Sequence, residues 1–68
     1  MIEHAQLFRA LRDFEWGSLR IRQGEVIAVE HTDERTATAY LERDPGHTQI
    51  ISREAIESMR MLGNMENK

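Results

Sequence analysis

The sequence predicts a mainly β domain: a small barrel of five short strands, closed by a short C-terminal helix. Three observations support this fold class. Strand-like segments recur at intervals of roughly 8–12 residues, and glycine, proline or aspartate stands between them. The spacing of apolar residues becomes helical only near the end of the chain.

The chain has 68 residues, which is enough for one domain. A single core below roughly 70–80 residues rarely contributes more than about 3–5 kcal/mol. The absence of cysteine excludes both a disulfide and a thiolate metal cluster. We therefore expect either very regular packing or a second subunit that covers apolar surface.

Two strands and a turn are clear in the first half of the chain. Ser18–Arg22 alternates apolar and polar residues, which is typical of a half-buried strand. Gln23–Gly24 then predicts a turn, and the β-branched run Val26–Val29 predicts that the chain returns as the next strand of a hairpin. Gln6–Phe14 does not alternate cleanly and fits either a strand or a helical turn.

The second half adds two strands. Asp33–Glu34 marks a turn, and the threonines and tyrosine of Thr36–Leu41 are typical of a strand. Asp44–Gly46 is the strongest turn signal of the chain, since proline fixes φ and glycine tolerates positive φ. Thr48–Ile51 is expected to form a short last strand.

A helix follows the last strand. Ser52 stands where an N-cap belongs, and Gly63 stands where a C′ residue belongs. We therefore expect one domain over residues 1–63 and a loose, flexible tail over residues 64–68.

One face of this helix is apolar and is formed at helical spacing by Ala55, Ile56, Met59 and Leu62. The methionines near the end, Met59, Met61 and Met65, add an adaptable apolar patch. We expect this patch to pack on the barrel, or to form a dimer contact if the barrel cannot accommodate it.

The charges argue against nucleic acid as a general ligand. The formal net charge is -3, and residues 30–68 carry eight acidic and five basic groups. This half repels a phosphate backbone. Eight arginines stand against one lysine, and the planar guanidinium suits carboxylates, phosphates and aromatic faces. A genome rich in G and C would produce the same bias.

No apolar run approaches the roughly 18 residues that cross a bilayer, and Met1–His4 does not resemble the start of a signal peptide. We therefore expect a cytoplasmic protein without a membrane partner.

The chain resembles the SH3 domain family over about residues 8–59. Ala10–Phe14 is similar to the first-strand motif, and Leu19–Val29 to the diverging-turn hairpin that follows it. Thr36–Leu41 falls where the family has two tryptophans and a small buried residue, and Ile50–Ile56 where it has a short helical turn. The resemblance implies an SH3-like barrel.

The peptide groove of that family is not matched. SH3 domains hold a proline-rich peptide between aromatic side chains. Apart from the aromatic Phe14, the matching positions hold Arg12, Thr36, Ser52 and Ala55. The loop between the first two strands is reduced to Glu15–Gly17. We therefore expect the scaffold without proline-peptide binding.

Two further resemblances are local. Pro45–Ile51 and Ala55–Glu57 are similar to the C-terminal stretch of the type II dihydrofolate reductases, SH3-like tetramers whose central pore binds folate and NADPH. That resemblance implies the pore residues Gln49, Ile50 and Ile51. However, Ile51 stands in place of a tyrosine, and the pore-mouth lysine has no counterpart.

Ile50–Ile56 also resembles the last strand and helix start of the carbon-storage-regulator RNA-binding dimers, whose glycine-rich N-terminal strand is absent here. This resemblance places Arg53 at an RNA-contacting arginine. RNA binding by this chain would then use Arg20, Arg22 and Arg53.

No catalytic or metal site is predicted. His4, His31 and His47 lack the spacing of metal ligands, and the acidic residues around Asp33 are typical of a solvated turn. The chain has no glycine-rich phosphate loop and no Ser/His/Asp order that indicates a nucleophile. We expect neither an enzyme nor a cofactor.

Trp16 is the strongest candidate for a contact with a partner, because tryptophan is enriched where interfaces concentrate their binding energy. The alternative is a lid over one open end of the barrel. Arg20 and Arg22 project from one strand face, beside Arg9 or Arg12 on the adjoining strand, and suit an acidic protein or a phosphate strand. The alternative there is a solvated face.

The function predicted from the sequence is a small non-catalytic adaptor or regulator, of the kind found free-standing in bacteria and phages. It would bind another protein of acidic character, as a monomer or a homo-oligomer, through Arg12, Phe14, Trp16, Arg20 and Arg22. RNA binding and a reductase are the two alternatives.

Overall fold

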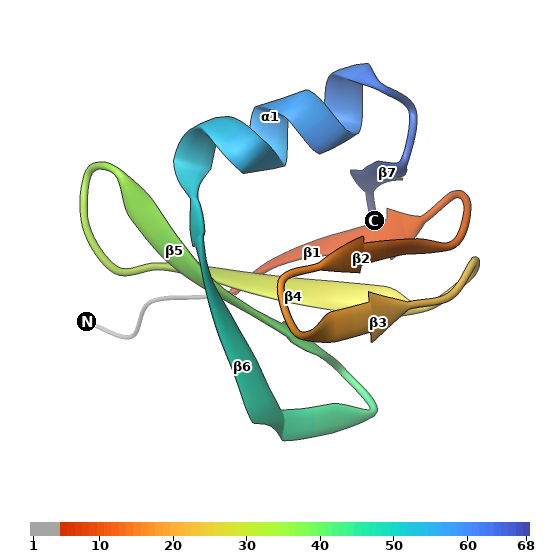
Figure 1. Cartoon of the computed structure of the whole chain (residues 1–68), viewed down its shortest axis with the longest axis horizontal. Helices are drawn as coiled ribbons and strands as arrows, with labels where there is room; N and C mark the ends of the chain where they lie inside the picture. The colour runs from red at the N-terminus through yellow and green to blue at the C-terminus, as the bar shows by residue number, and fades with distance from the viewer. Residues whose placement is uncertain (1–4) are drawn as a thin grey trace.

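Residues 5–68, which the computed structural model describes, contain seven strands and one helix (Figure 1). They are, in order, β1 (Gln6–Ala10), β2 (Phe14–Trp16), β3 (Leu19–Ile21), β4 (Val26–His31), β5 (Thr36–Leu41), β6 (Asp44–Ser52), α1 (Arg53–Met61) and β7 (Met65–Asn67). Five strands form one antiparallel sheet in the order β6-β5-β4-β1-β7, and β2 pairs with β3 in a separate hairpin. The mainly β class with one short helix near the C-terminal end is therefore confirmed.

The core lies on the face of the five-stranded sheet that the β2–β3 hairpin and α1 cover (Figure 1). Strand β5 shows the alternation best, because Ala37, Ala39 and Leu41 are buried and the residues between them are only half-buried on the other face. Every element contributes to the buried cluster, which consists of Phe8, Ala10, Trp16, Leu19, Ile21, Ile27, Val29, Ala37, Ala39, Leu41, Ile51, Ile56 and Met65.

The turn at Gln23–Gly24 exists, but it does not close a hairpin. The N–H of Glu25 donates to the carbonyl of Arg22 (3.0 Å), yet β3 pairs with β2, and β4 pairs with β1 and β5. The expected pairing of β3 with β4 is therefore wrong. Phe14–Trp16, which the sequence pattern places mostly in a loop, ends only two residues before β3, so the tight Gly17–Ser18 turn closes a shorter hairpin.

The turn between β5 and β6 lies at Glu42–Arg43 and not at the expected Asp44–Gly46, which instead begins β6. Tyr40 of β5 pairs with Thr48, whereas the next residue, Leu41, pairs with Asp44. Residues 45–47 therefore have no partner in β5 and form a bulge. Strand β6 is at an edge of the sheet, where a proline does not remove a needed ladder bond. The proline and glycine therefore interrupt the ladder within the strand and do not form the turn.

Helix α1 begins and ends where its capping residues predict. The Oγ atom of Ser52 accepts from the N–H of Ala55 (3.1 Å), and Gly63 has φ 79. The N–H of Gly63 donates to the carbonyl of Arg60 (3.1 Å), and the next N–H donates one residue further back, to Met59 (2.9 Å). This pair of bonds is a Schellman motif, which satisfies the last helical carbonyls. Within residues 5–68, no helix has the length and apolar character needed to span a bilayer.

The C-terminal residues are not the loose tail that the sequence predicts. Met65–Asn67 forms β7, which pairs with β1, and the side chain of Met65 is only 2% exposed. A strand of three residues is too short to show a period of two, so no pattern marks it in the sequence. Met65 reaches the core because the Schellman turn redirects the chain onto the open edge of β1.

The apolar face of the helix is narrower than its spacing predicts. Ile56 is buried and Ala55 and Met59 pack partly against the core, but Leu62 is 65% exposed and Met61 is 84% exposed. Leu62 is the C-cap residue and still has αR dihedrals, and the chain leaves the helical path at the next residue, Gly63, where φ is 79.

Candidate functional site

Three arginine side chains line an open groove of about 570 Å³ beside the β2–β3 hairpin. We call it the arginine groove, and its lining residues are Arg20, Arg22, Gln23, Glu25 and Arg43. They come from β3, from the turn after β3 and from the β5–β6 turn. The groove therefore carries three positive charges and one negative charge.

The pleat of β3 directs its arginines into the groove. Leu19 and Ile21 are 2% and 1% exposed, so Arg20 and Arg22, which alternate with them, face outward and are exposed. The two arginines predicted to share one strand face thus lie on the same groove. Arg43 completes it from a turn that is far away in the sequence.

Glu25 fixes the position of Arg43. One carboxylate oxygen of Glu25 accepts from Nε of Arg43, and the other accepts from the N–H of Arg22 (2.8 Å). The Glu25 side chain is 17% exposed and that of Arg43 is 58% exposed. The hydrogen bond from Arg43 is the main cause that lowers the pKa of Glu25; burial opposes this shift, and the N–H of Arg22 supports it. The same bond raises the pKa of Arg43.

The lowered pKa of Glu25 predicts acid sensitivity. A carboxylate with a lowered folded-state pKa contributes stability above its ordinary pKa of 4.5, and this contribution is lost as the pH falls through the lower folded value. Glu25→Gln removes the negative charge and leaves one acceptor oxygen for the two donors, Arg43 and the N–H of Arg22, so we expect its urea midpoint at pH 7 to show a loss of about 1 kcal/mol. At pH 3 the difference from the unmodified chain should shrink.

A matched control for this experiment is Glu15→Gln. Glu15 lies 3.4 Å from Arg20, but both side chains are largely exposed (66% and 79%). Such a pair contributes little to stability, so we expect Glu15→Gln to leave the midpoint unchanged at both pH values. Equal losses for Glu15→Gln and Glu25→Gln would contradict a specific role for the Glu25 bond.

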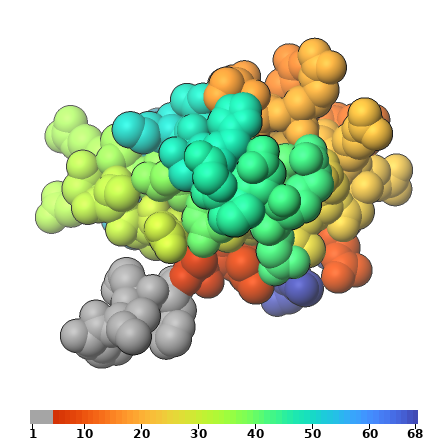
Figure 2. Space-filling view, turned by 90° about the horizontal axis from the view of Figure 1, so that it is seen from below, coloured from red at the N-terminus to blue at the C-terminus, as the bar shows by residue number. Residues whose placement is uncertain are grey.

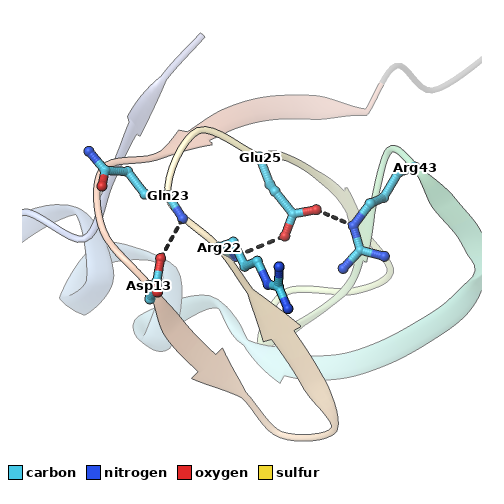
Figure 3. Close-up of polar contacts among 5 residues, drawn as sticks. All are labelled: Asp13, Arg22, Gln23, Glu25 and Arg43. Atoms are coloured by element: carbon cyan, nitrogen blue, oxygen red, sulfur yellow. Dashed lines mark hydrogen bonds and ion pairs between the residues drawn. The ribbon is translucent and has the colours of Figure 1, made fainter.

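Arg22 is held by its backbone and leaves its side chain unengaged. Figure 3 shows the Arg22 and Arg43 guanidinium groups beside Glu25, and both line the same groove. Among residues 5–68, no hydrogen bond or ion pair engages the guanidinium of Arg22. The turn itself is fastened to the hairpin, because Asp13 accepts from the N–H of Gln23 (2.8 Å, Figure 3).

Gln49 ties the hairpin turn to β6. Its Oε1 atom accepts from the N–H and from Oγ of Ser18, both at 2.9 Å. Gly17 has φ 59, and a Cβ atom at this position would lie 2.4 Å from Cδ of Gln49. Any larger residue at Gly17 would be strained and would displace the Gln49 side chain. This contact keeps β3, and with it the arginine groove, in place.

Ser18 and His47 lie close together beside Gln49. Oγ of Ser18 is 3.1 Å from Nε2 of His47. The hydroxyl of Ser18 also donates to Oε1 of Gln49 at 2.9 Å. These contacts add to the attachment of the hairpin turn to β6.

Trp16, expected to contact a partner, lies in the core. It is 5% exposed, and its ring stands edge-on to Phe14 with the centroids 6.0 Å apart and the planes at 73°. Burial of the ring is also what the alternative expectation, a lid over one open end of the predicted barrel, requires. Phe14 is half-buried and lines a second hollow of about 470 Å³, whose other lining residues are Asp13, Glu15, Arg20, Ile21 and Arg22.

The remaining predicted arginines lie elsewhere. Arg12 is exposed, and one of its Nη atoms would be 3.7 Å from a Cβ atom at Gly63. It therefore lies beside the C-terminal end of α1, where its charge suits the helix dipole, and does not line the arginine groove. Arg9 faces Glu66 of β7 in the register of the sheet.

Arg53 has a structural position at the β4–β5 turn. Its Nη1 atom donates to the carbonyls of Asp33 and Glu34, both at 3.2 Å. The carboxylate of Asp33 accepts from the N–H groups of Arg35 and Thr36 (2.8 Å each), and these bonds lower the pKa of Asp33. Arg53 lines one hollow with Phe8, His31 and Arg60, whereas Arg20 and Arg22 line others beside the β2–β3 hairpin.

The three residues implied for a reductase pore lie in different surroundings. Ile51 is 8% exposed and belongs to the core, whereas Ile50 is 69% exposed on the other side of β6. Gln49 is engaged by Ser18. One chain therefore does not present the three side chains on one surface.

The structure also shows no cluster of at least three histidine, cysteine, aspartate or glutamate residues suited to a metal ion within residues 5–68. His31 and His47 are exposed, and His4 lies outside the described residues. Arg43 is the arginine of the groove that the sequence pattern does not indicate, because its place depends on where the β5–β6 turn falls.

Comparison of the chain with protein-family models, with curated proteins and with solved structures gives no match.

Proposed function

We propose that this chain is a small, non-catalytic protein-binding module with an SH3-like barrel, and that its arginine groove binds an acidic segment of another protein. The strand order supports the barrel, because an antiparallel sheet of five strands wraps the core with a hairpin inserted between β1 and β4. The groove of Arg20, Arg22 and Arg43 is the observation that carries the proposed binding.

The chemistry of the groove favours carboxylates. A guanidinium presents a planar fork of donors that matches a carboxylate in two-point contacts. Glu25 holds Arg43 ready at one side, and the unengaged Arg22 at the other side can contact a ligand without breaking an internal bond. Preorganisation of this kind lowers the cost of binding.

An acidic protein segment fits this groove better than a nucleic acid. The chain has a net charge of -3, and Asp13 and Glu15 line the adjoining hollow, so a long phosphate backbone that extends from the groove into this hollow would meet repulsion. A short acidic peptide contacts the groove alone. This reasoning also keeps RNA as the alternative that an experiment must exclude.

A charge reversal at Arg22 tests the proposal. We expect Arg22→Glu to weaken binding of a fluorescein-labelled oligoglutamate peptide at least about tenfold, equivalent to about 1.4 kcal/mol, in a fluorescence anisotropy titration at low salt. The fold should persist, because the Arg22 side chain is exposed. The matched control is Arg35→Glu, an equal charge change at the exposed β4–β5 turn, which should have a much smaller effect.

A gain of binding provides the opposite test. Glu15→Gln removes the carboxylate that pairs with Arg20, so we expect it to tighten peptide binding. If Arg22→Glu and Arg35→Glu lower the peptide affinity equally, then net charge alone explains the effect and the arginine groove is not the binding site. Tighter binding of a polyuridine oligonucleotide than of the peptide, lost with Arg22→Glu, would establish the RNA alternative instead.

A further inference from the structure

The outer side of β5 and β6 is an uncharged surface at the edge of the sheet. Ile50, near its centre, is 69% exposed. We call this surface the uncharged edge, and it is formed by Thr36, Thr38, Tyr40, Thr48, Ile50 and Ser52. Charged residues make up 31% of the whole chain, so six neighbouring outward positions without any charge are unusual for a surface that only meets water.

Strand β6 also has a free row of backbone groups. Among the described strands it pairs only with β5. Figure 2 shows segment 44–52, green to teal, at the surface across the middle of that view. Proteins usually protect such an edge with charges, proline or a bulge. Here Pro45 and the bulge protect the first half of β6, whereas residues 48–52 have no such protection.

The register shows which backbone groups face outward. The N–H of Arg53 donates to the carbonyl of Arg35 (2.8 Å), so this pair is hydrogen-bonded. Bonded and non-bonded pairs alternate along an antiparallel ladder. Thr38 and Ile50, three steps along the ladder, are therefore a non-bonded pair, and the N–H and C=O of Ile50 point away from β5. In agreement, the carbonyl of Ile50 accepts from the side chain of Gln49 (3.2 Å).

We infer that two copies of this chain pair along β6, antiparallel and about a two-fold axis at Ile50. In this register the outward N–H and C=O of each Ile50 bond to those of the other copy, and Thr48 lies opposite Ser52. The surface is thus complementary to itself, as a two-fold interface requires. The two exposed Ile50 side chains meet at the axis and cover each other from water.

A second copy is the occupant that this edge fits. An acidic or basic foreign strand would place its charges against six uncharged positions and gain no partner for them. The second copy brings an equally uncharged edge and an equally unpaired row of backbone groups. In the dimer, the carbonyl of Ile50 accepts from a backbone N–H of the other copy and no longer from the side chain of Gln49. Each chain therefore loses one side-chain hydrogen bond and gains backbone hydrogen bonds of the ladder.

The mass of the full chain in solution tests the inference. Sedimentation equilibrium from micromolar to millimolar concentration should show the mass rising from 8.0 kDa toward twice that value. Ile50→Lys places two like charges face to face at the axis and should weaken the dimer at least about tenfold. Since Ile50 is exposed, the monomer should keep its far-UV circular dichroism spectrum. The control is Leu62→Lys, which introduces the same charge at a position that is 65% exposed beyond α1.

Amide hydrogen exchange locates the interface. The N–H groups of Thr48 and Ile50 should exchange more slowly as the protein concentration rises, whereas that of Met61 should not change. A mass of 8.0 kDa at every concentration overturns the inference. So does a dimer that survives Ile50→Lys, or one that Leu62→Lys disrupts equally.

Discussion

Trp16→Ala is expected to unfold the domain. The Trp16 side chain is 5% exposed and belongs to the buried cluster together with Leu19 and Ile21. Removal of a buried tryptophan costs about 3–5 kcal/mol, and a core of this size contributes about the same amount in total. Far-UV circular dichroism and urea titration at 25 °C should show no cooperative transition for the variant.

Two controls distinguish loss of the core from loss of a surface contact. Trp16→Phe keeps most of the buried volume and the edge-on contact with Phe14, so it should unfold cooperatively at a lower urea midpoint. Leu62→Ala, at a side chain that is 65% exposed, should change stability by less than about 0.5 kcal/mol. A folded Trp16→Ala variant with an unchanged midpoint would contradict the burial of this ring.

Met65→Ala should destabilise the domain by about 2–5 kcal/mol. Met65 is 2% exposed, and β7 pairs with β1 on an edge that has no other neighbour among the described strands. Truncation after Asn64 should be more severe, because it also removes the bond from the N–H of Lys68 to the carbonyl of Leu7 (3.0 Å). Thermal unfolding followed by circular dichroism measures both effects.

Met61→Ala is the matched control, since it removes the same side chain from a position that is 84% exposed. We expect its melting temperature to stay within the error of the unmodified chain. If the truncated chain and the full chain melt together, then β7 contributes nothing to stability and residues 65–68 behave as the flexible tail that the sequence predicts.

The parts of the fold that follow from the sequence are those where local chemistry decides. The strand Thr36–Leu41 has the predicted bounds because its threonines and tyrosine alternate without interruption with the apolar residues Ala37, Ala39 and Leu41. Helix α1 has the predicted caps because Ser52 and Gly63 each satisfy backbone groups next to them in the chain. Interactions of this kind join residues that are close in the sequence, so they form regardless of how the distant parts of the chain are arranged.

The parts that do not follow depend on distant partners. Phe14–Trp16 is a strand because β3 returns beside it, and β7 is a strand because β1 leaves an edge open to it. A proline such as Pro45 normally indicates a turn. Here it lies in a bulge, because Asp44 on one side of it and Thr48 on the other both pair with β5. In each case the pairing partner, and not the segment itself, selects the conformation.

The candidate site divides along the same line. The alternation of β3 predicts that Arg20 and Arg22 share a face, and the structure places both on the arginine groove. Arg43 joins them only because its turn begins two residues before the predicted one, beside Glu25. Tryptophan is a residue type typical of interfaces, but a small domain without disulfides needs its largest side chain in the core.

The pairing of β1 with β7 brings the first and last strands of the described chain side by side. Phe8 faces Asn67, so this part of the sheet closes only after the residues between these two strands have been synthesised. A ribosome-bound chain that lacks Met65 has an unfilled core and an open edge on β1. Completion of this sheet therefore requires that Met65–Asn67 has left the exit tunnel, and until then the apolar surface of the nascent chain is open to aggregation.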